Sequence, residues 1–153
     1  MNITILGTGN MAKGLASVFA AGGYDVTLGS RDAARAKETA KALGARVKGE
    51  GLAAAASKAD VIVLAVPFDA AAETIAAAGG LAGKILVDIS NPLTPDYMGL
   101  TVGHSTSAAE EIQKLAPKAK VVKAFNTVFA SVLQGGGKIG KTAVTVFVAG
   151  DDE

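Results

Sequence analysis

The sequence predicts an α/β fold, a doubly wound and mostly parallel sheet with helices on both faces. Strand-like and helical segments alternate along nearly all of the 153 residues, which is typical of this class. Residues 61–66 form a continuous apolar run, as expected of a strand that is buried on both faces. Half of the residues are hydrophobic but only 5% are aromatic, so aliphatic side chains must build the core. We expect the strand order 3-2-1-4-5-6, with an additional C-terminal strand.

The strands are expected where apolar and β-branched residues run together between turn residues. They cover residues 2–6, 24–28, 46–48, 60–66, 84–89, 119–125 and 142–149. The helices are expected at residues 10–22, 32–43, 52–58, 69–78, 107–116 and 129–134. Glycines follow several of these helices, Asp69 is expected to cap the fourth, and Ser107 with Glu110 forms a capping box at the fifth.

The first strand opens onto Gly7-Thr8-Gly9-Asn10-Met11-Ala12, which fits the pattern G-x-G-x-x-A at the start of a helix. In dinucleotide-binding folds of the Rossmann type, the first glycine permits a tight turn and the second lets the backbone approach a pyrophosphate. Ala12 replaces the third glycine and is small enough for close packing of helix on strand. Because a helix N-terminus attracts anions, we expect a dinucleotide pyrophosphate there.

The end of the second strand predicts which dinucleotide binds. NAD enzymes usually place Asp or Glu there to bind the ribose 2′-hydroxyl, whereas Gly29 has no carboxylate that would repel a phosphate. Ser30 is a hydrogen-bond donor, and Arg31 and Arg35 carry guanidinium groups. Charged hydrogen bonds of about 1.5–3 kcal/mol each would favour NADP by roughly ten-fold to a few hundred-fold. Alternatively, Ser30 or Asp32 only caps the next helix and Arg31 is solvated.

Three further strand ends are expected to line the crevice where the strand order reverses, because open α/β sheets bind ligands there. The residues concerned are Val66, Pro67, Phe68, Asn91, Pro92, Ala124 and Asn126. Apolar groups among them are expected to pack on a nicotinamide ring, and the two asparagine amides to bond its ribose or carboxamide. Alternatively, the prolines only end strands and the asparagines form turns.

Six spaced motifs cover residues 7–11, 29–32, 65–68, 88–93, 107–110 and 123–127. They stand in the order found in NADPH-dependent reductases of the deazaflavin coenzyme F420, and the chain resembles this family over nearly its whole length. The resemblance implies that residues 8–11 hold the pyrophosphate and that Ser30, Arg31 and Arg35 hold the 2′-phosphate. It further implies a nicotinamide site at the three strand ends.

The same resemblance implies an NADP-dependent oxidoreductase that passes hydride between NADPH and F420, with a flavin or another acceptor equally consistent. It also implies that the full-length protein forms a homodimer. More distantly, the chain resembles the ferric-reductase domains of metalloreductases and the N-terminal domain of pyrroline-5-carboxylate reductase. An NADP-binding module without turnover of its own is the alternative to an enzyme.

Few side chains are suited to acid–base catalysis. Hydride transfer to a flavin-like ring needs alignment of two rings, whereas carbonyl reduction more often uses a Tyr, Lys or His proton donor. Neither Tyr24 nor Tyr97 is followed by a lysine four residues later. His104, the single histidine, lies in a loop where it either faces the acceptor or is solvated. We therefore expect no catalytic acid or base and leave His104 as a weak candidate.

Residues 135–142 match the phosphate-loop pattern G-x-x-x-x-G-K-T, but in the wrong context. That motif requires a strand before it and a helix after it, so that the helix N-terminus faces the phosphates. Here a helix-like run precedes the motif and a strand follows it. We expect a connecting loop and no nucleotide hydrolysis.

Composition gives no reason to expect a nucleic-acid, membrane or metal partner. A net charge of +1 gives no reason to expect nucleic acid or an anionic membrane surface. The chain has no cysteine and one histidine, which argues against disulfides and a metal site. No apolar run reaches the ~20 residues that span a bilayer. Met1 directly precedes the first strand, with no space for a signal peptide. We expect a cytoplasmic protein.

The last residues carry one more expectation. Gly150, Asp151, Asp152 and Glu153 follow a strand and have the acidic character of a helix start. We therefore expect one NAD(P)-binding domain over residues 1–153, truncated before a C-terminal helical segment that contributes to dimerisation.

Overall fold

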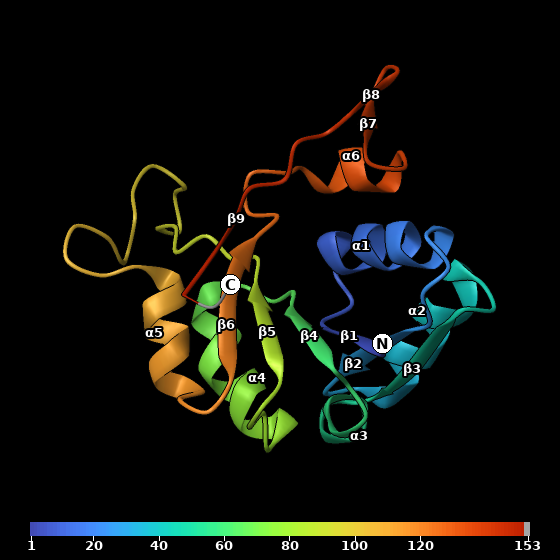
Figure 1. Cartoon of the computed structure of the whole chain (residues 1–153), viewed down its shortest axis with the longest axis horizontal. Helices are drawn as coiled ribbons and strands as arrows, with labels where there is room; N and C mark the ends of the chain where they lie inside the picture. The colour runs from blue at the N-terminus through green and yellow to red at the C-terminus, as the bar shows by residue number, and fades with distance from the viewer. Residues whose placement is uncertain (152–153) are drawn as a thin grey trace.

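The computed structural model describes residues 1–151, and its central sheet has seven strands in the order β3-β2-β1-β4-β5-β6-β9 (Figure 1). Strands β1 to β6 are parallel, and β9 is antiparallel to β6. The predicted fold class and strand order are confirmed. The strands are β1 (Ile3–Leu6), β2 (Val26–Ser30), β3 (Val47–Gly51), β4 (Val61–Leu64), β5 (Ile85–Asp88), β6 (Lys120–Ala124) and β9 (Val148–Gly150).

Helices cover both faces of the sheet. They are α1 (Asn10–Ala21), α2 (Ala33–Leu43), α3 (Leu52–Ser57), α4 (Ala71–Ala78), α5 (Ala108–Leu115) and α6 (Ala130–Gln134), with a 3₁₀ turn η1 (Phe68–Ala70) before α4. One buried cluster joins the sheet to α1, α2 and α6, and a second joins it to α3, α4 and α5. No helix in the described part of the chain is long and apolar enough to cross a membrane.

The register of the sheet fixes where a ligand crevice forms. Leu6 at the end of β1 is level with Gly29 in β2 and with Leu64 at the end of β4. The carboxyl ends of these three parallel strands therefore lie at one edge. The strand order reverses between β1 and β4, which is where such sheets bind ligands.

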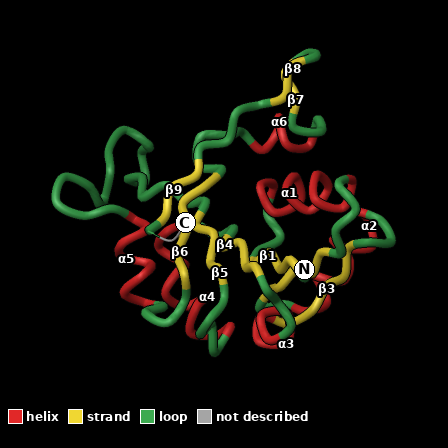
Figure 2. The backbone as a smooth tube through the Cα atoms, viewed as in Figure 1, coloured by secondary structure: helices red, strands yellow, loops and turns green. Residues whose placement is uncertain are grey.

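The C-terminal part departs from the prediction. The single strand expected at 142–149 is divided: β8 (Thr142–Ala143) pairs with β7 (Lys138–Ile139), and only β9 joins the main sheet. This β7–β8 hairpin projects beyond α6, away from the sheet (Figure 2). It occupies the segment with the phosphate-loop pattern, which follows α6 and precedes no helix up to residue 151. Asp152 and Glu153, part of the expected helix start, lie outside the described residues.

The predicted capping box at α5 is confirmed, the predicted cap at Asp69 is not, and Asp32 caps α2 as the alternative for residues 30–32 stated. The Asp32 side chain accepts hydrogen bonds from the N–H groups of Ala34 and Arg35 at the start of α2. Ser107 and Glu110 form the predicted capping box at α5. The prediction for Asp69 is wrong, because this residue lies inside η1 and the N-cap of α4 has no side-chain hydrogen bond.

Candidate cofactor-binding site

The turn after β1 requires a glycine. Gly7 has φ +130°, a conformation that side chains disfavour, and its N–H donates a 2.8 Å hydrogen bond to the Gly29 carbonyl. A Cβ at this position would lie 2.3 Å from the carbonyl oxygen of Ala65. The turn is thus held between the ends of β2 and β4.

The amino end of α1 is open to a ligand. Gly9 is its N-cap and supplies no side-chain hydrogen bond, so side chains leave the first helical N–H groups uncapped. A Cβ at Gly9 would meet nothing within 4 Å. Asn10 is exposed, Met11 is half-buried, and Thr8 is 9% exposed. This space and the unpaired N–H groups are what an anion needs at a helix N-terminus.

Helix α6 packs across α1 and supports this end. Gln134 donates through Nε2 to the carbonyl oxygen of Asn10, at 3.2 Å. Gly14 permits the close approach, because a Cβ there would lie 2.7 Å from the Cβ of Leu133. This support was not predicted, since nothing in the local sequence pattern links residues 124 positions apart.

The end of β2 differs in detail from the prediction. Gly29 is buried, and a Cβ there would lie 2.8 Å from Leu6 Cδ2 and 3.1 Å from the Cβ of Ala55. Gly29 therefore points toward helix α3, which packs on the sheet at this position. The last residue of β2 is Ser30. The Ser30 hydroxyl accepts a 3.2 Å hydrogen bond from the N–H of Asp32. No carboxylate occupies either position, as predicted.

Arg31 is held by an ion pair. Its Nη1 donates to both carboxylate oxygens of Glu73 in α4, at 3.0 Å each. The two side chains stay 69% and 65% exposed. The alternative considered above is consistent with these contacts, because Asp32 caps α2 and Arg31 is largely solvated, although it also pairs with Glu73. Arg35 is exposed in the first turn of α2.

Asn91 and Asn126 meet beyond the ends of β5 and β6. Asn91 Nδ2 donates to the Asn126 carbonyl at 3.0 Å, and Asn126 Nδ2 donates to Asn91 Oδ1 at 3.3 Å. Phe125, with φ +60°, turns the chain between β6 and Asn126. Its ring packs edge-on against Phe19 of α1, with centroids 6.1 Å apart. A non-glycine residue at positive φ marks a constrained position, and this conformation of Phe125 was not predicted.

A buried network anchors the same strand ends. Asp88, fully buried at the end of β5, accepts hydrogen bonds from the Ser90 N–H and hydroxyl at 2.8 and 2.7 Å. Lys123 of β6 donates to Asp88 Oδ2 at 2.7 Å and also to the Ser90 carbonyl. This network was not predicted. The available signal was a single charged residue, Lys123, between the apolar residues at the end of a predicted strand.

The remaining predicted residues are divided between surface and core. Val66 lies beside the first turn, with its Cγ1 3.5 Å from a Cβ built at Gly7. Pro67 is exposed, Phe68 packs against the cluster under α3 and α4, and Ala124 is 3% exposed. Pro92 accepts two hydrogen bonds from Thr101, which fold the following loop back.

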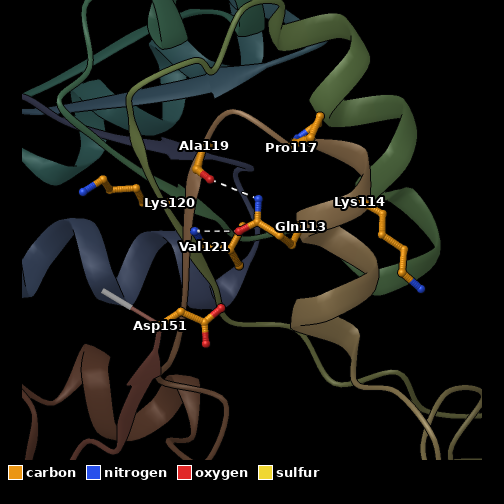
Figure 3. A pocket seen from close by; sticks show the side chains of 7 residues that line it. All are labelled: Gln113, Lys114, Pro117, Ala119, Lys120, Val121 and Asp151. Carbon is orange, nitrogen blue, oxygen red and sulfur yellow. Dashed lines mark hydrogen bonds between the residues drawn. The ribbon is translucent and has the colours of Figure 1, made fainter. Parts of the chain in front are cut away.

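Two cavities lie near β6. The larger, about 870 Å³, is bordered by Asn91, Pro92 and Lys123 and by apolar side chains such as Leu100 and Val102. It therefore adjoins the strand ends just described. The smaller, about 510 Å³, lies between α5 and β6 (Figure 3).

The smaller cavity has a structural explanation. Gln113 donates to the Ala119 carbonyl at 3.0 Å and accepts from the Val121 N–H at 3.3 Å (Figure 3). It also donates to the Ala116 carbonyl at 3.0 Å. These bonds tie α5 to β6 and use the Gln113 side chain within the protein.

Neither the two tyrosines nor the histidine considered above lies at the strand ends, whereas Lys123 does and is bonded to Asp88 and Ser90. Tyr24 precedes β2, at the opposite edge of the sheet, and Tyr97 is 78% exposed in the loop after β5. His104 is also exposed in that loop, with φ +60°. Among residues 1–151 there is no group of three His, Asp or Glu side chains that could hold a metal ion.

The fold, the glycine turn and the open start of α1 define a Rossmann-type dinucleotide-binding protein. A family model described as "NADP oxidoreductase coenzyme F420-dependent" matches residues 2–92. The chain belongs to this family.

Three similar proteins illustrate the relationship. The chain is 35% identical over 144 residues to metalloreductase STEAP3 of Rattus norvegicus, covering 94% of this chain and 28% of that protein. It is 34% identical over 148 residues to the F420-dependent NADP reductase of Methanothermobacter marburgensis, covering 87% of this chain and 66% of that protein. The crystal structure of a putative F420-dependent NADP reductase from Arthrobacter sp. FB24 has a TM-score of 0.86 at 34% identity, over 98% of this chain and 73% of that one. The metalloreductase is thus no more distant in identity than the F420-dependent reductase.

Proposed function

We propose that this chain binds NADP(H) along the carboxyl ends of its parallel strands and transfers hydride between it and a deazaflavin such as F420, or a flavin. The observation that carries this proposal is the open amino end of α1 at the same sheet edge as Arg31. The relatives support it, because F420-dependent NADP reductases are named for both the dinucleotide and the deazaflavin.

The residues at the start of α1 fit a pyrophosphate. Gly7 fixes the turn, and Gly9 leaves the space that a side chain would fill. Thr8, Asn10 and Met11 complete the proposed pyrophosphate site, in which uncapped backbone N–H groups donate to the anion.

The residues after β2 fit a 2′-phosphate. The Ser30 hydroxyl and the guanidinium groups of Arg31 and Arg35 would donate to it. Arg31 needs to leave Glu73 at least in part for this contact, and its high exposure makes that movement inexpensive.

The ends of β4, β5 and β6 are proposed to hold the nicotinamide half. The residues are Val66, Pro67, Phe68, Asn91, Pro92, Ala124 and Asn126. The buried Ala124 limits the depth of the site, and the Asn91–Asn126 pair presents amide groups that can orient a ribose or carboxamide. The Asp88–Ser90–Lys123 network fixes the backbone that carries Asn91.

Bound NADPH supplies the hydride, and the protein contributes position and water exclusion. We propose the 870 Å³ cavity as the acceptor site, because it shares Asn91 and Pro92 with the nicotinamide half. The absence of Tyr and His from the strand ends within the described residues suits a ring acceptor, since such chemistry needs no protein proton donor there.

Binding of NADP(H) without turnover is the second candidate. The chain spans 66% of the F420-dependent NADP reductase and 28% of the metalloreductase. From the resemblance, we also propose a cytoplasmic location and a homodimer of the full-length protein.

An acceptor assay distinguishes the candidates. The chain would be mixed with NADPH and F420, FMN or FAD under anaerobic conditions while NADPH absorbance is followed. Oxidation of NADPH by any of these acceptors supports the reductase. NADPH binding without oxidation supports the binding module, and a folded chain that binds no NADPH contradicts both.

A further inference from the structure

We infer that Glu73 determines how strongly the chain prefers NADP(H) over NAD(H), by competing with the 2′-phosphate for Arg31. This inference rests on the proposed function, in which Arg31 binds that phosphate. It adds a residue from α4 that has no place in the dinucleotide fingerprint.

The ion pair crosses the proposed adenosine side of the crevice. Arg31 directly follows β2, whereas Glu73 lies in the first turn of α4, which follows β4 and η1. Strand β1 lies between β2 and β4 in the sheet. The contact therefore joins the two elements that flank the end of β1, 42 positions apart in the sequence.

The geometry makes the carboxylate a competitor. Both oxygens of Glu73 engage Nη1 of Arg31 at 3.0 Å, so the guanidinium already has an anionic partner in the free protein. A phosphate dianion on Arg31 would either displace this carboxylate or lie beside it, and both outcomes oppose binding. NADH has no 2′-phosphate and leaves the ion pair intact.

The size of the effect follows from exposure. Both side chains are about two-thirds exposed, and ion pairs of this kind shift an equilibrium by no more than about five-fold. Glu73 therefore lowers NADPH affinity modestly and selectively. Glu73 also lies in the first turn of α4, where the helix dipole favours a carboxylate. This second effect acts on the stability of the fold and is separate from the effect on NADPH binding.

Calorimetric titration with NADPH and with NADH tests the inference on the wild type, Glu73→Gln, Arg31→Ala and the double variant. We expect Glu73→Gln to tighten NADPH binding by about two- to five-fold and to leave NADH unchanged. In the Arg31→Ala background the same change should have no effect on either cofactor. Asp25→Asn is the matched control, because it removes an exposed carboxylate–arginine ion pair, with Arg46, at the opposite end of β2. Thermal unfolding of each variant measures the effect on α4 separately.

Three outcomes overturn the inference while leaving the proposed function intact, provided that the wild type prefers NADPH. They are unchanged NADPH affinity in Glu73→Gln, weaker NADPH affinity, or equal tightening for both cofactors. A wild type without any preference for NADPH overturns the inference and the proposed 2′-phosphate site together.

Discussion

Gly7 presents its Cα to the carbonyl oxygen of Ala65, where the chain leaves β1 beside the end of β4. A Cβ at Gly7 would lie 2.3 Å from that oxygen, and φ is +130°. The glycine is therefore required by the protein's own packing before any cofactor is considered.

Gly7→Ala should destabilise the folded chain by about 1–3 kcal/mol, because alanine is strained at this φ and its Cβ meets backbone rather than a movable side chain. Urea unfolding of the variant and the wild type measures the difference. Equal midpoints would show that the turn relaxes and that the close contact has no energetic consequence.

Gly9→Ala should separate binding from folding. A Cβ at this position meets nothing within 4 Å, so stability should change little. The methyl group fills the proposed pyrophosphate space and should weaken NADPH and NADH by a similar factor, since both carry the pyrophosphate. Calorimetry and thermal unfolding on the same samples provide both readings. A variant that binds both cofactors normally would contradict the assignment of the phosphate site.

Much of the fold could be predicted because local patterns and the parallel topology agree. The run at 61–66, the glycine turn after residue 6 and the capping box at Ser107 each specify one element, and right-handed crossovers then fix the strand order. The split of the last predicted strand could not be predicted in this way. A β-branched run in 142–148 indicates strand character but not which partner each half pairs with.

The parts of the candidate site that lie within one short motif could be predicted from the sequence. The contacts between residues far apart in the sequence could not. The G-x-G-x-x-A turn and Arg31 were identified from their spacing. The partners that hold them were not: Glu73 for Arg31, Gln134 for Asn10 and Lys123 for Asp88 depend on long-range packing. Nor could spacing show that Gly29 faces α3, because that depends on the register of β2 against β1.

The two partners of the buried ion pair should differ in their effect on stability. Lys123→Met would leave the fully buried Asp88 carboxylate without its cation and should cost about 3–5 kcal/mol. Asp88→Asn leaves a lysine whose side chain is 22% exposed and can reach water, so it should cost less. Urea unfolding ranks the two variants. The reverse order would show that the network is more open than these contacts indicate.

The capping box predicts a specific acid sensitivity. Hydrogen bonds from Ser107, first from its side chain and then from its backbone, hold the pKa of Glu110 below its ordinary value of 4.5. A carboxylate with a lowered pKa stabilises the fold above that value, and the contribution is lost as pH falls through the folded-state pKa. Glu110→Gln should therefore be less stable than the wild type near neutral pH, and the difference should shrink in acid. A difference that stays constant from neutral pH into the acid range would contradict this role.

Arg31→Ala should weaken NADPH binding by about ten-fold or more and leave NADH nearly unchanged, because only NADPH carries the 2′-phosphate. Arg46→Ala is the control, since Arg46 pairs with Asp25 at the opposite end of β2, at 3.3 Å. Calorimetry with both cofactors compares the two variants. Equal losses for NADPH and NADH in Arg31→Ala would show that Arg31 does not contact the 2′-phosphate.

The most direct test of the account is a calorimetric titration of the unaltered chain with NADPH and with NADH. Binding does not depend on the identity of the acceptor, and folding can be checked on the same sample by circular dichroism. We expect NADPH to bind at least about ten-fold more tightly than NADH. Equal affinities, or no binding by a demonstrably folded chain, would contradict it.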